Sequence, residues 1–569
     1  MKAKNVLEVG LLGLALGAAA AQARPVEGRV FLDDNKNGRV DAGETGLAHV
    51  AVSDGHGVVC TDSEGRYRLE AAEAPALVWV CVPRDHQPVG GFWRRAEGDG
   101  PTDFGLFRQA QPEDFVFIQI TDAHVGRGDL VKKFAQQLNR YPASCAFVVN
   151  TGDLMGGVDV AFPDKALTQY ERYREAASAF TVPLFNIPGN HEHVAINVAA
   201  ADKTDPRYGK GLYRQVFGPT YYSWDWAGVH CLALDGTRVP YQEALGAEQL
   251  AWLAADLQAQ PPEKPVVMFC HQALFSLADA KALAAALRER KVLGAFCGHL
   301  HKTFTAEQPD YCVYMTGAMS GAWWSGPNID GTPQGFRLVQ VKGGSLKTVY
   351  GGREGLCPVS VVAPLATAVR SNVMEVAVAV VDFGRPAEVS ASYEGCPVAL
   401  TPSAREELWT IWRGSVDTRG EADGDRVLRI FTKAGGEAGT NEIRYLVING
   451  REEPYAASGP AILRVQVRGV DVEEAVRLNG EPLGVIPAGT PKESTLAFEV
   501  SPERLKKINR VTLSAGPQGK VRDSFNFGPV SLEYKGRKLH DLRYASFERF
   551  TILGTDPKRS EKELYICLP

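Results

Sequence analysis

Hydrophobic and polar positions repeat with different periods in successive parts of the chain. Between residues 25 and 108, short β-type runs such as GRVFL, GRYRLE and ALVWVCV are separated by turns rich in Gly and Asp. This pattern is typical of small antiparallel sandwiches. It predicts an N-terminal β-sandwich module over residues 24–110.

The middle of the chain, residues 111–352, alternates two kinds of pattern. Apolar strand-like runs such as FVFIQI, VHCLALD and KPVVMFC alternate with helical patterns over DLVKKFAQQLNR, residues 165–179 and AEQLAWLAADLQA. Strands that alternate with helices form sheets covered by helices, so this region is predicted to be an α/β domain. Residues 353–569 return to short alternating runs, for example VMEVAVAVVDFG and ILRVQVRGV, and predict a C-terminal β-rich domain.

The N-terminus has the pattern of an export signal. MKAKN supplies positive charge, the segment from Val6 to Ala20 is mostly apolar with Glu8 as an interruption, and Ala21-Gln22-Ala23 fits a cleavage site. We predict a signal peptide over residues 1–23 and a periplasmic, secreted or cell-surface protein, with an uncleaved N-terminal anchor as the alternative. No other stretch reaches the ~20 apolar residues of a membrane span.

Composition excludes little but names no partner. The 569 residues exceed what one hydrophobic core accommodates, and a net charge of −5 gives no nucleic-acid-binding signature. None of the ten cysteines forms a CxxC pair, and Cys145, Cys231, Cys270 and Cys297 lie in or at the end of apolar runs, as buried free thiols do. Cys60 with Cys81 is the pair that we most expect to form a disulfide.

A calcium-loop spacing lies inside the N-terminal module, in DDNKNGRVDAGE. Its flanks are strand-like, and together with TDSEGRY it resembles the B-type repeat modules of bacterial surface proteins. We expect one structural Ca²⁺, with a plain polar hairpin as the alternative. The oxygen donors would be Asp33, Asn35, Asn37, Asp41 and Glu44, with Arg39 through its carbonyl and Gly38 at the sharp turn.

Side chains that bind metals follow five of the apolar runs in the α/β region. Six of the eleven histidines lie at these places. Because the carboxyl ends of neighbouring strands meet at one crevice of an open α/β sheet, one shared pocket is expected. The residues concerned are Asp122, His124, Asp153, Asn190, His191, Glu192, His193, His271, His299 and His301.

This mixture of imidazole, carboxylate and amide groups indicates a site for two metal ions. In an extended segment residues i and i+2 face the same side, so Asp122 with His124, and His299 with His301, can turn to one point. A carboxylate can bridge two cations about 3.5–4 Å apart, a spacing suited to hydrolysis at phosphorus. One such histidine alone would be interpreted as an ordinary hydrogen-bonded side chain.

The segments TDAH, TGDL, GNHE, CH and GHLH occur in the order found in the calcineurin-like metallophosphoesterases, and the chain resembles this family over about 180 residues. The resemblance implies a four-layer α/β/β/α core with two stacked mixed sheets, where periodicity alone allows a single doubly wound sheet. The flanking β regions are similar to those of some exported bacterial members. After TGD, however, this chain has LMGG where many members carry a polar residue, so a contact made from there is missing or supplied elsewhere.

The resemblance also implies roles for single residues around two divalent or trivalent transition metals, Zn, Mn or Fe. The first metal would be held by Asp122, His124 and His301, the second by Asn190, His271 and His299, and both by Asp153. A hydroxide bridging the metals would attack phosphorus. His191 would be catalytic without being a ligand, because imidazole can bind the phosphate or protonate the leaving alkoxide near neutral pH. Glu192 and His193 are expected to orient the turn through hydrogen bonds.

Asn190 and His191 are expected to contact the substrate. Two loops are further candidates for such contacts. TGAMSGAWWSGPN places Trp323 and Trp324 after a predicted strand, where they could stack a nucleobase, a sugar face or a lipid chain, or else pack against the β regions. The insertion 200–226 carries Lys203, Arg207, Lys210 and Arg214. It is expected to form part of the pocket wall, with a phosphate clamp or a solvated loop as alternatives.

The sequence therefore predicts an exported hydrolase for phosphomonoesters or phosphodiesters, whose substrate is a small-molecule, glycan or lipid phosphate ester. One alternative is a pyrophosphatase-type cleavage of a nucleotide-sugar or lipid-linked diphosphate. Another, of a different class, is a non-catalytic surface or glycan-binding protein. The complete set of metal-ligand residues argues against the non-catalytic alternative.

Overall fold

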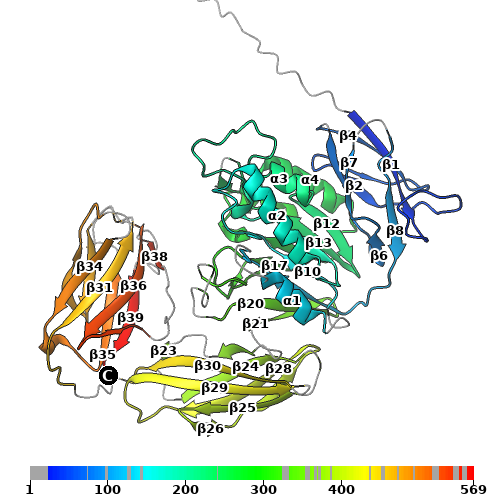
Figure 1. Ribbon diagram of the computed structural model, residues 1–569. Helices are drawn as coiled ribbons and strands as arrows, with labels where there is room; N and C mark the ends of the chain where they lie inside the picture. Colours follow the sequence, from blue (N-terminus) through cyan, green and yellow to red (C-terminus); the bar gives the residue numbers. More distant parts are fainter. Residues whose placement is uncertain are drawn as a thin grey trace, which may run out of the picture. The chain divides into compact units, whose positions relative to one another are not determined.

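The computed structural model (Figure 1) describes the following residues: 24–73, 75–96, 100–124, 130–140, 145–239, 241–322, 324, 328, 332–352, 359–363, 368–369, 373–382, 384, 387–434, 437–449, 455–468, 470, 473–490, 494–514, 524–541, 550–553 and 561–569. The predicted signal peptide therefore lies outside the described residues. The chain divides into two compact units, one of Met1–Ala110 with Ala251–Pro261 and one of Gln111–Leu250 with Pro262–Pro569.

The first unit contains two four-stranded sheets. One has the order β4 (Arg66–Ala71), β1 (Arg24–Leu32), β8 (Phe104–Arg108) and β6 (His86–Pro88). The other has the order β3 (Val58–Cys60), β2 (Ala51–Ser53), β5 (Ala76–Val80) and β7 (Trp93–Ala96). Exposed and buried residues alternate along β4, whereas β5 is buried throughout, which confirms the strands predicted from GRYRLE and ALVWVCV.

The disulfide expected between Cys60 and Cys81 is not formed. The sheet order gives the reason, because β2 lies between β3 and β5. Cys60 is paired with Ala51 on one side of β2, and the Cys81 amide donates to the Ala51 carbonyl from the other side. Two strand spacings of about 4.8 Å separate the two backbones, which exceeds the ~7 Å that a disulfide can span. The four thiols predicted to be buried and outside any disulfide are so.

The second unit carries two mixed sheets between residues 115 and 352. The five-stranded sheet has the order β11 (Leu184–Asn186), β10 (Val148–Asn150), β9 (Phe115–Ile120), β20 (Gly335–Lys342) and β21 (Ser345–Gly352). The six-stranded sheet has the order β12 (Tyr222–Trp226), β13 (Val229–Leu234), β16 (Val266–Cys270), β17 (Val292–Cys297), β19 (Cys312–Met315) and β18 (Phe304–Glu307). A hairpin is formed by β14 (Thr237–Arg238) and β15 (Gln242–Glu243).

Helices alternate with these strands, as the sequence pattern predicts for an α/β region. They are α1 (Leu130–Leu138), α2 (Pro163–Ala177), α3 (Gly211–Val216), α4 (Gly246–Gln258) and α5 (Ala280–Leu287), with the 3₁₀ helices η2 (Asn190–Glu192) and η3 (Leu274–Ser276). Helix α2 begins with Pro163, whose fixed φ suits the first helical position. Its buried residues, Ala166, Tyr170, Tyr173 and Ala176, recur at the helical period and form one apolar face.

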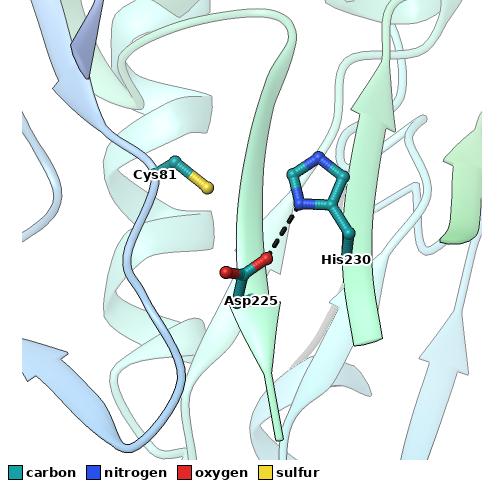
Figure 2. A group of neighbouring side chains, drawn as sticks. All are labelled: Cys81, Asp225 and His230. Carbon is teal, nitrogen blue, oxygen red and sulfur yellow. Dashed lines mark hydrogen bonds and ion pairs between the residues drawn. The ribbon is translucent and has the colours of Figure 1, made fainter. Parts of the chain in front are cut away.

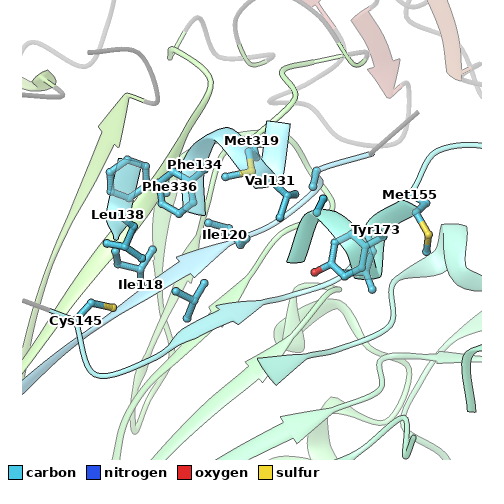
Figure 3. Close-up of a cluster of buried hydrophobic side chains, with 14 of the residues drawn as sticks. Ile118, Ile120, Val131, Phe134, Leu138, Cys145, Met155, Tyr173, Met319 and Phe336 are labelled. Carbon is cyan, nitrogen blue, oxygen red and sulfur yellow. The ribbon is translucent and has the colours of Figure 1, made fainter. Parts of the chain in front are cut away.

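Strand β9 shows how the sequence places two layers at once. Phe117 faces the six-stranded sheet, where its ring centroid lies 5.4 Å from that of Phe269 and 5.3 Å from that of Phe296. Ile118 and Ile120 point to the opposite face, since neighbouring residues of a strand alternate. There they join an apolar cluster with Val131, Phe134 and Leu138 of α1 (Figure 3).

Beyond residue 358 the described residues form strands and one 3₁₀ helix, η4 (Pro502–Arg504). The first sheet has the order β22 (Val359–Ala363), β24 (Val373–Val381), β28 (Trp409–Asp417) and β27 (Thr401–Arg405). The second has the order β23 (Ala368–Val369), β30 (Glu437–Val447), β29 (Gly424–Ala434), β25 (Ala387–Tyr393) and β26 (Cys396–Val398). The third sheet has the order β34 (Ser494–Val500), β31 (Ala461–Arg468), β36 (Ser524–Tyr534) and β37 (Arg537–Leu539), and β38 (Phe550–Leu553) also pairs with β36. The fourth has the order β33 (Glu481–Ile486), β32 (Glu474–Leu478), β35 (Ile508–Ser514) and β39 (Glu561–Cys567). Among the described residues no helix has the length and apolar character needed to cross a membrane.

Candidate metal centre

All the metal-binding side chains named from the sequence lie just beyond the carboxyl ends of strands. Asp122 and His124 follow β9, Asp153 follows β10, and the turn after β11 leads into η2. His271 follows β16, and His299 and His301 follow β17. Among these strand-end side chains, three groups have ligand atoms within 4.8 Å of one another: Asp122–His124–His301, His124–Asp153–His191 and Asp153–His271–His299. The groups share His124 and Asp153, so they form one continuous cluster.

Asp122 lies at the centre of the first group. Its Oδ2 accepts hydrogen bonds from the Thr121 hydroxyl at 2.7 Å and from the His299 amide at 3.0 Å. Its Oδ1 is buried and has no hydrogen-bond partner in the described part of the chain. The Nε2 atoms of His301, His124 and His271 lie 3.1, 3.8 and 3.9 Å from that oxygen. An unpartnered carboxylate oxygen facing imidazole nitrogens fits a cation site.

Asp153 joins the two halves of the cluster. Its Oδ2 lies 3.0 Å from His271 Nε2 and 3.8 Å from His124 Nε2, while its Oδ1 accepts the His191 amide at 2.9 Å. The Asn190 Oδ1 lies 3.1 Å from His271 Nε2. Asn190 therefore adds an amide oxygen beside Asp153, on the side of His271.

Hydrogen bonds on the far side of two rings fix which nitrogen faces the cluster. His271 Nδ1 donates to the Thr151 carbonyl at 2.8 Å, and His301 Nδ1 donates to the Ala322 carbonyl at 2.6 Å. Carbonyl oxygens only accept, so the proton of each neutral ring sits on Nδ1 and the Nε2 lone pair points inward. This is the tautomer that metal-ligating histidines adopt.

The electrostatics of the cluster favour positive charge. Burial raises the pKa of Asp122, but the nearby His301 and His271 outweigh it and hold this pKa below its usual range. Burial lowers the pKa of His271, but Asp153 and Asp122 overcome this and raise it to about 10. Burial lowers the pKa of His124 to about 3, which leaves a neutral ring with a free lone pair. The donor set and its charge therefore fit transition-metal cations.

Glycines allow the ligand loops to approach one another. A Cβ atom on Gly189 would lie 2.2 Å from Asp153 Oδ1, and one on Gly298 would lie 1.9 Å from the Thr121 hydroxyl oxygen. Both distances are far below van der Waals contact. The glycine of GNHE and the glycine of GHLH are thus required by close packing between segments distant in sequence.

Several cluster residues have left-handed backbone conformations that L-residues disfavour. The φ angles are 52° at Asp122, 44° at His124, 52° at Asp153, 68° at His299 and 48° at His301. Each such residue costs on the order of 1–3 kcal/mol and persists only where its surroundings hold it. The chain thus carries local strain at the positions that aim these side chains inward.

His191 forms a pair with a residue that sequence reasoning missed. Its Nδ1 lies 3.0 Å from Asp159 Oδ1, and the other Asp159 oxygen accepts the Asn197 amide at 2.9 Å. Burial lowers the pKa of His191, but the bond to Asp159 and the charge of Asp153 outweigh it and raise this pKa to about 9. Asp159 stands six residues after Asp153, beyond LMGG, and supplies the polar contact whose absence after TGD the sequence left open.

Glu192 connects two ligand loops. Its buried carboxylate accepts the backbone amides of Asp153 at 2.9 Å, Leu154 at 2.9 Å and Gly189 at 2.6 Å. His193 Nδ1 donates to the Asn190 carbonyl at 3.0 Å. Both residues thus hold the turn by hydrogen bonds, as expected.

Glu243 is a second residue that the sequence did not single out. It lies in the short strand β15, and its Oε1 is 3.4 Å from His299 Nε2 and accepts the Tyr241 hydroxyl at 3.0 Å. No local motif marks it, because only the β14–β15 hairpin brings it to the cluster.

Of the two tryptophans proposed to contact substrate, Trp323 lies outside the described residues. Trp324 is 50% exposed and has φ 67°. Its ring centroid lies 5.3 Å from that of His124 and 6.2 Å from that of His191. The structure therefore brings Trp324 to the edge of the cluster.

Basic residues of the insertion 200–226 are engaged by carboxylates. Arg207 pairs with Asp164 at 2.6 Å and Asp205 at 2.8 Å, and Lys210 pairs with Asp235 at 2.5 Å. These bonds tie the insertion to neighbouring segments. Neither residue supports the phosphate-clamp alternative.

The predicted calcium loop is folded around its own polar groups. Asp33 accepts the amides of Asn37 at 3.1 Å and Gly38 at 2.7 Å. Asp41 Oδ2 accepts the side-chain amides of Asn35 and Asn37, both at 2.7 Å. The Asp41 amide donates to Glu44 at 2.9 Å, and the Arg39 amide donates to the Asn37 side chain at 2.8 Å. The residues proposed as calcium ligands thus lie close to one another within the first unit.

A further histidine–carboxylate pair lies away from the cluster. Figure 2 shows His230 of β13 beside Asp225 of β12, with Nδ1 and Oδ1 2.8 Å apart. The other Asp225 oxygen accepts Lys264 Nζ at 2.6 Å. His230 is fully buried, so we interpret the pair as an interaction that stabilises the sheet.

The chain has distant likenesses among solved structures. No match was found among curated proteins. Solved structures with similarity include the GAP50 anchor of the inner membrane complex of Plasmodium, at 14% identity and a TM-score of 0.31, covering 42% of this chain and 85% of that one. A conserved protein of Streptococcus pneumoniae, described as a predicted phosphoesterase, has 13% identity and a TM-score of 0.23, covering 42% of this chain and 90% of that one. An archaeal phosphodiesterase has 10% identity and a TM-score of 0.23, covering 42% of this chain and 99% of that one. Likenesses at this level say nothing of a substrate.

Two family models match adjoining parts of the chain. Residues 34–106 match the N-terminal domain of calcineurin-like phosphoesterases. Residues 115–303 match the calcineurin-like phosphoesterase domain, a range that contains every strand-end residue of the cluster from Asp122 to His301. The part of the chain from residue 34 to residue 303 therefore belongs to the calcineurin-like metallophosphoesterase family.

Proposed function

We propose that this phosphoesterase hydrolyses phosphomonoesters or phosphodiesters at two transition-metal ions held by the strand-end cluster. The observation that carries the proposal is the position of Asp153, which belongs to two of the overlapping groups of ligand atoms. Its Oδ2 faces His271 Nε2 at 3.0 Å and His124 Nε2 at 3.8 Å. A carboxylate shared in this way suits a bridging ligand.

The donor set supports an assignment of ligands to each metal. The first would be held by Asp122, His124 and His301, the second by Asn190, His271 and His299, and both by Asp153. Neutral imidazoles with carboxylate and amide oxygens suit Zn, Mn or Fe. When bound, such cations would offset phosphoryl charge and lower the pKa of a water molecule between them.

The residues around the cluster then have separable tasks. His191 Nδ1 is engaged by Asp159, so Nε2 is the atom that would pass a proton to the leaving oxygen. Glu192 would keep the Asp153 and Gly189 backbones together, and Glu243 would orient His299.

Finer features of the architecture belong to the same proposal. Contacts of Phe117 with Phe269 and Phe296, with α1 on the other face of β9, support a four-layer core over residues 111–352. The two sheets of the first unit support a β-sandwich over residues 24–110, with Ca²⁺ in the loop from Asp33 to Glu44. Residues 353–569 would form the β-rich domain, and residues 1–23 would direct export.

The test is metal analysis beside hydrolysis. Purified protein is analysed by plasma mass spectrometry and assayed with an aryl phosphomonoester and an aryl phosphodiester. We expect about two transition metals per chain, as a bridging ligand requires. Asp153→Asn should lose metal and turnover, whereas His191→Ala should lose turnover and keep metal.

Protein that remains metal-free and inactive after incubation with Mn²⁺ or Zn²⁺ would contradict the proposal and favour the binding-protein alternative. Turnover of a nucleotide-sugar diphosphate with neither aryl ester cleaved would instead favour the pyrophosphatase alternative.

A further inference from the structure

We infer that the site is built for phosphodiesters whose phosphorus carries two planar or aromatic groups, one against Trp324 and the other against Tyr241. The inference rests on the proposed function and decides between monoesters and diesters. The sequence left that choice open, and Tyr241 had no role in it.

Trp324 borders the half of the cluster that contains His124. Its ring contacts His124 and His191, and half of the residue is exposed. A Cβ atom at Gly156 would lie 3.8 Å from Trp324 Cε2, so this ring also lies close to the LMGG segment. Because His191 is the proposed proton donor to the leaving oxygen, the group attached to that oxygen would lie against Trp324.

The loop before Trp324 is fixed to the ligand strands. The Met319 amide donates to the Thr121 carbonyl at 2.9 Å, and the Ser320 hydroxyl donates to the Asp122 carbonyl at 2.7 Å. The Ala322 carbonyl accepts His301 Nδ1 at 2.6 Å. The segment that precedes Trp324 is thus bonded to the cluster, and Trp324 itself has a left-handed backbone conformation.

Tyr241 borders the other half, which contains His299. Its hydroxyl donates to Glu243 Oε1 at 3.0 Å, and the same oxygen lies 3.4 Å from His299 Nε2. Its ring centroid is 6.4 Å from that of His193, and the residue is 49% exposed. The aromatic ring is therefore positioned beside the cluster with an open surface.

The two rings have the same character but border different ligand groups. A phosphomonoester has one organic group and could use one ring, which would leave the second exposed aromatic side chain without a purpose in binding. A diester has an organic group on each side of phosphorus, and each could stack on one ring. The retained group would lie against Tyr241 and the leaving group against Trp324.

The test uses three monoanions that cannot be hydrolysed because both substituents are joined to phosphorus through carbon. They are diphenylphosphinate, methyl(phenyl)phosphinate and dimethylphosphinate, titrated by calorimetry into the metal-loaded, full-length protein. We expect the dissociation constant to fall about fivefold to tenfold with each added ring. Trp324→Ala and Tyr241→Ala should each remove the gain from one ring, and the double variant should bind all three probes alike.

Matched variants separate recognition from folding. Trp324→Phe and Tyr241→Phe keep a ring, so they should keep most of the gradient, and circular dichroism checks that each alanine variant is folded. Equal binding of the three probes, no binding of any, or an equal loss for all three in a folded alanine variant would overturn the inference. Turnover is read separately: a graded series without ester hydrolysis refutes the proposed function alone, and hydrolysis with an ungraded series refutes this inference alone.

Discussion

The pairs His191–Asp159 and His230–Asp225 use the same groups at similar distances, 3.0 and 2.8 Å. His191 stands beyond a strand end, with its side chain 25% exposed, and its ring faces that of His124 5.2 Å away. His230 lies within a strand and is buried, and its carboxylate is also bound by Lys264. The two pairs therefore differ in their position along the strand and not in their chemical groups. A histidine beyond a strand end is open to a ligand, whereas one within a strand stabilises the sheet.

The change with the largest expected effect removes the carboxylate of Asp153, which accepts the His191 amide. Asp153→Asn should lower kcat/KM by ~10³-fold or more, because Asp153 in its proposed bridging role would supply several kcal/mol of charge stabilisation to both metals. Steady-state kinetics and metal analysis measure this. The matched change Asp225→Asn, at the buried pair, should leave metal content unchanged, and equal losses of metal in both variants would erase the distinction between the regions.

The next effect separates the two histidines directly. His191→Ala should lower kcat by about 10²–10⁴-fold, the usual contribution of a general acid. Metal content should stay at the wild-type value, because His191 is not assigned as a ligand. Normal turnover in His191→Ala would show that the strand-end pair is as structural as the buried one.

The buried pair should instead affect stability, and in a pH-dependent way. Burial raises the pKa of Asp225, but the hydrogen bond and charge of His230, together with Lys264, outweigh it, so the folded-state pKa lies below the ordinary value. A depressed pKa contributes stability that is present above the unfolded-state pKa of about 3.9 and is lost as the pH falls below it. Asp225→Asn should therefore lower the free energy of unfolding by about 1–3 kcal/mol at pH 7.

Denaturant titrations at pH 7 and near pH 3.5 measure this prediction. The gap between wild type and Asp225→Asn should narrow at the lower pH, because Asp225 of the unfolded wild-type chain takes up a proton there more readily than Asp225 of the folded chain. A gap that widens in acid would contradict the sign of the shift.

The smallest effect is expected from a change in Asp159, the partner of His191 at the strand end. Asp159→Asn keeps a hydrogen-bond acceptor but removes the charge, so His191 loses part of its orientation and kcat should fall by about 10-fold. The metals should remain bound. A loss as large as that of His191→Ala would mean that Asp159 itself acts on the substrate.

Much of the fold followed from pattern. The runs FVFIQI and KPVVMFC are β9 and β16, and the helical segments are α1, α2 and α4 within two residues of the predicted bounds. The division into two sheets did not follow from periodicity, because a buried strand has the same apolar run in either arrangement. The Cys60–Cys81 disulfide was wrong for a similar reason: the order β3-β2-β5 is set by pairing that the sequence does not state.

The site divides in the same way. The side chains that follow strands, such as Asp122 and His271, were named from the sequence, and the structure brings them together. Asp159 and Glu243 were missed because each reaches the cluster through a loop or hairpin whose path no motif encodes. Lys210 was assigned to a possible clamp because its partner Asp235 lies 25 residues away.

The left-handed backbone at Asp122, His124, Asp153, His299 and His301 bears on how such a protein changes over generations. Glycine adopts this conformation without steric strain, so replacing any of these side chains by glycine would relieve the backbone while it removes a proposed metal ligand. Stability and metal binding therefore favour different residues at these five positions, and a substitution that stabilised the chain there would weaken its hold on the proposed metals.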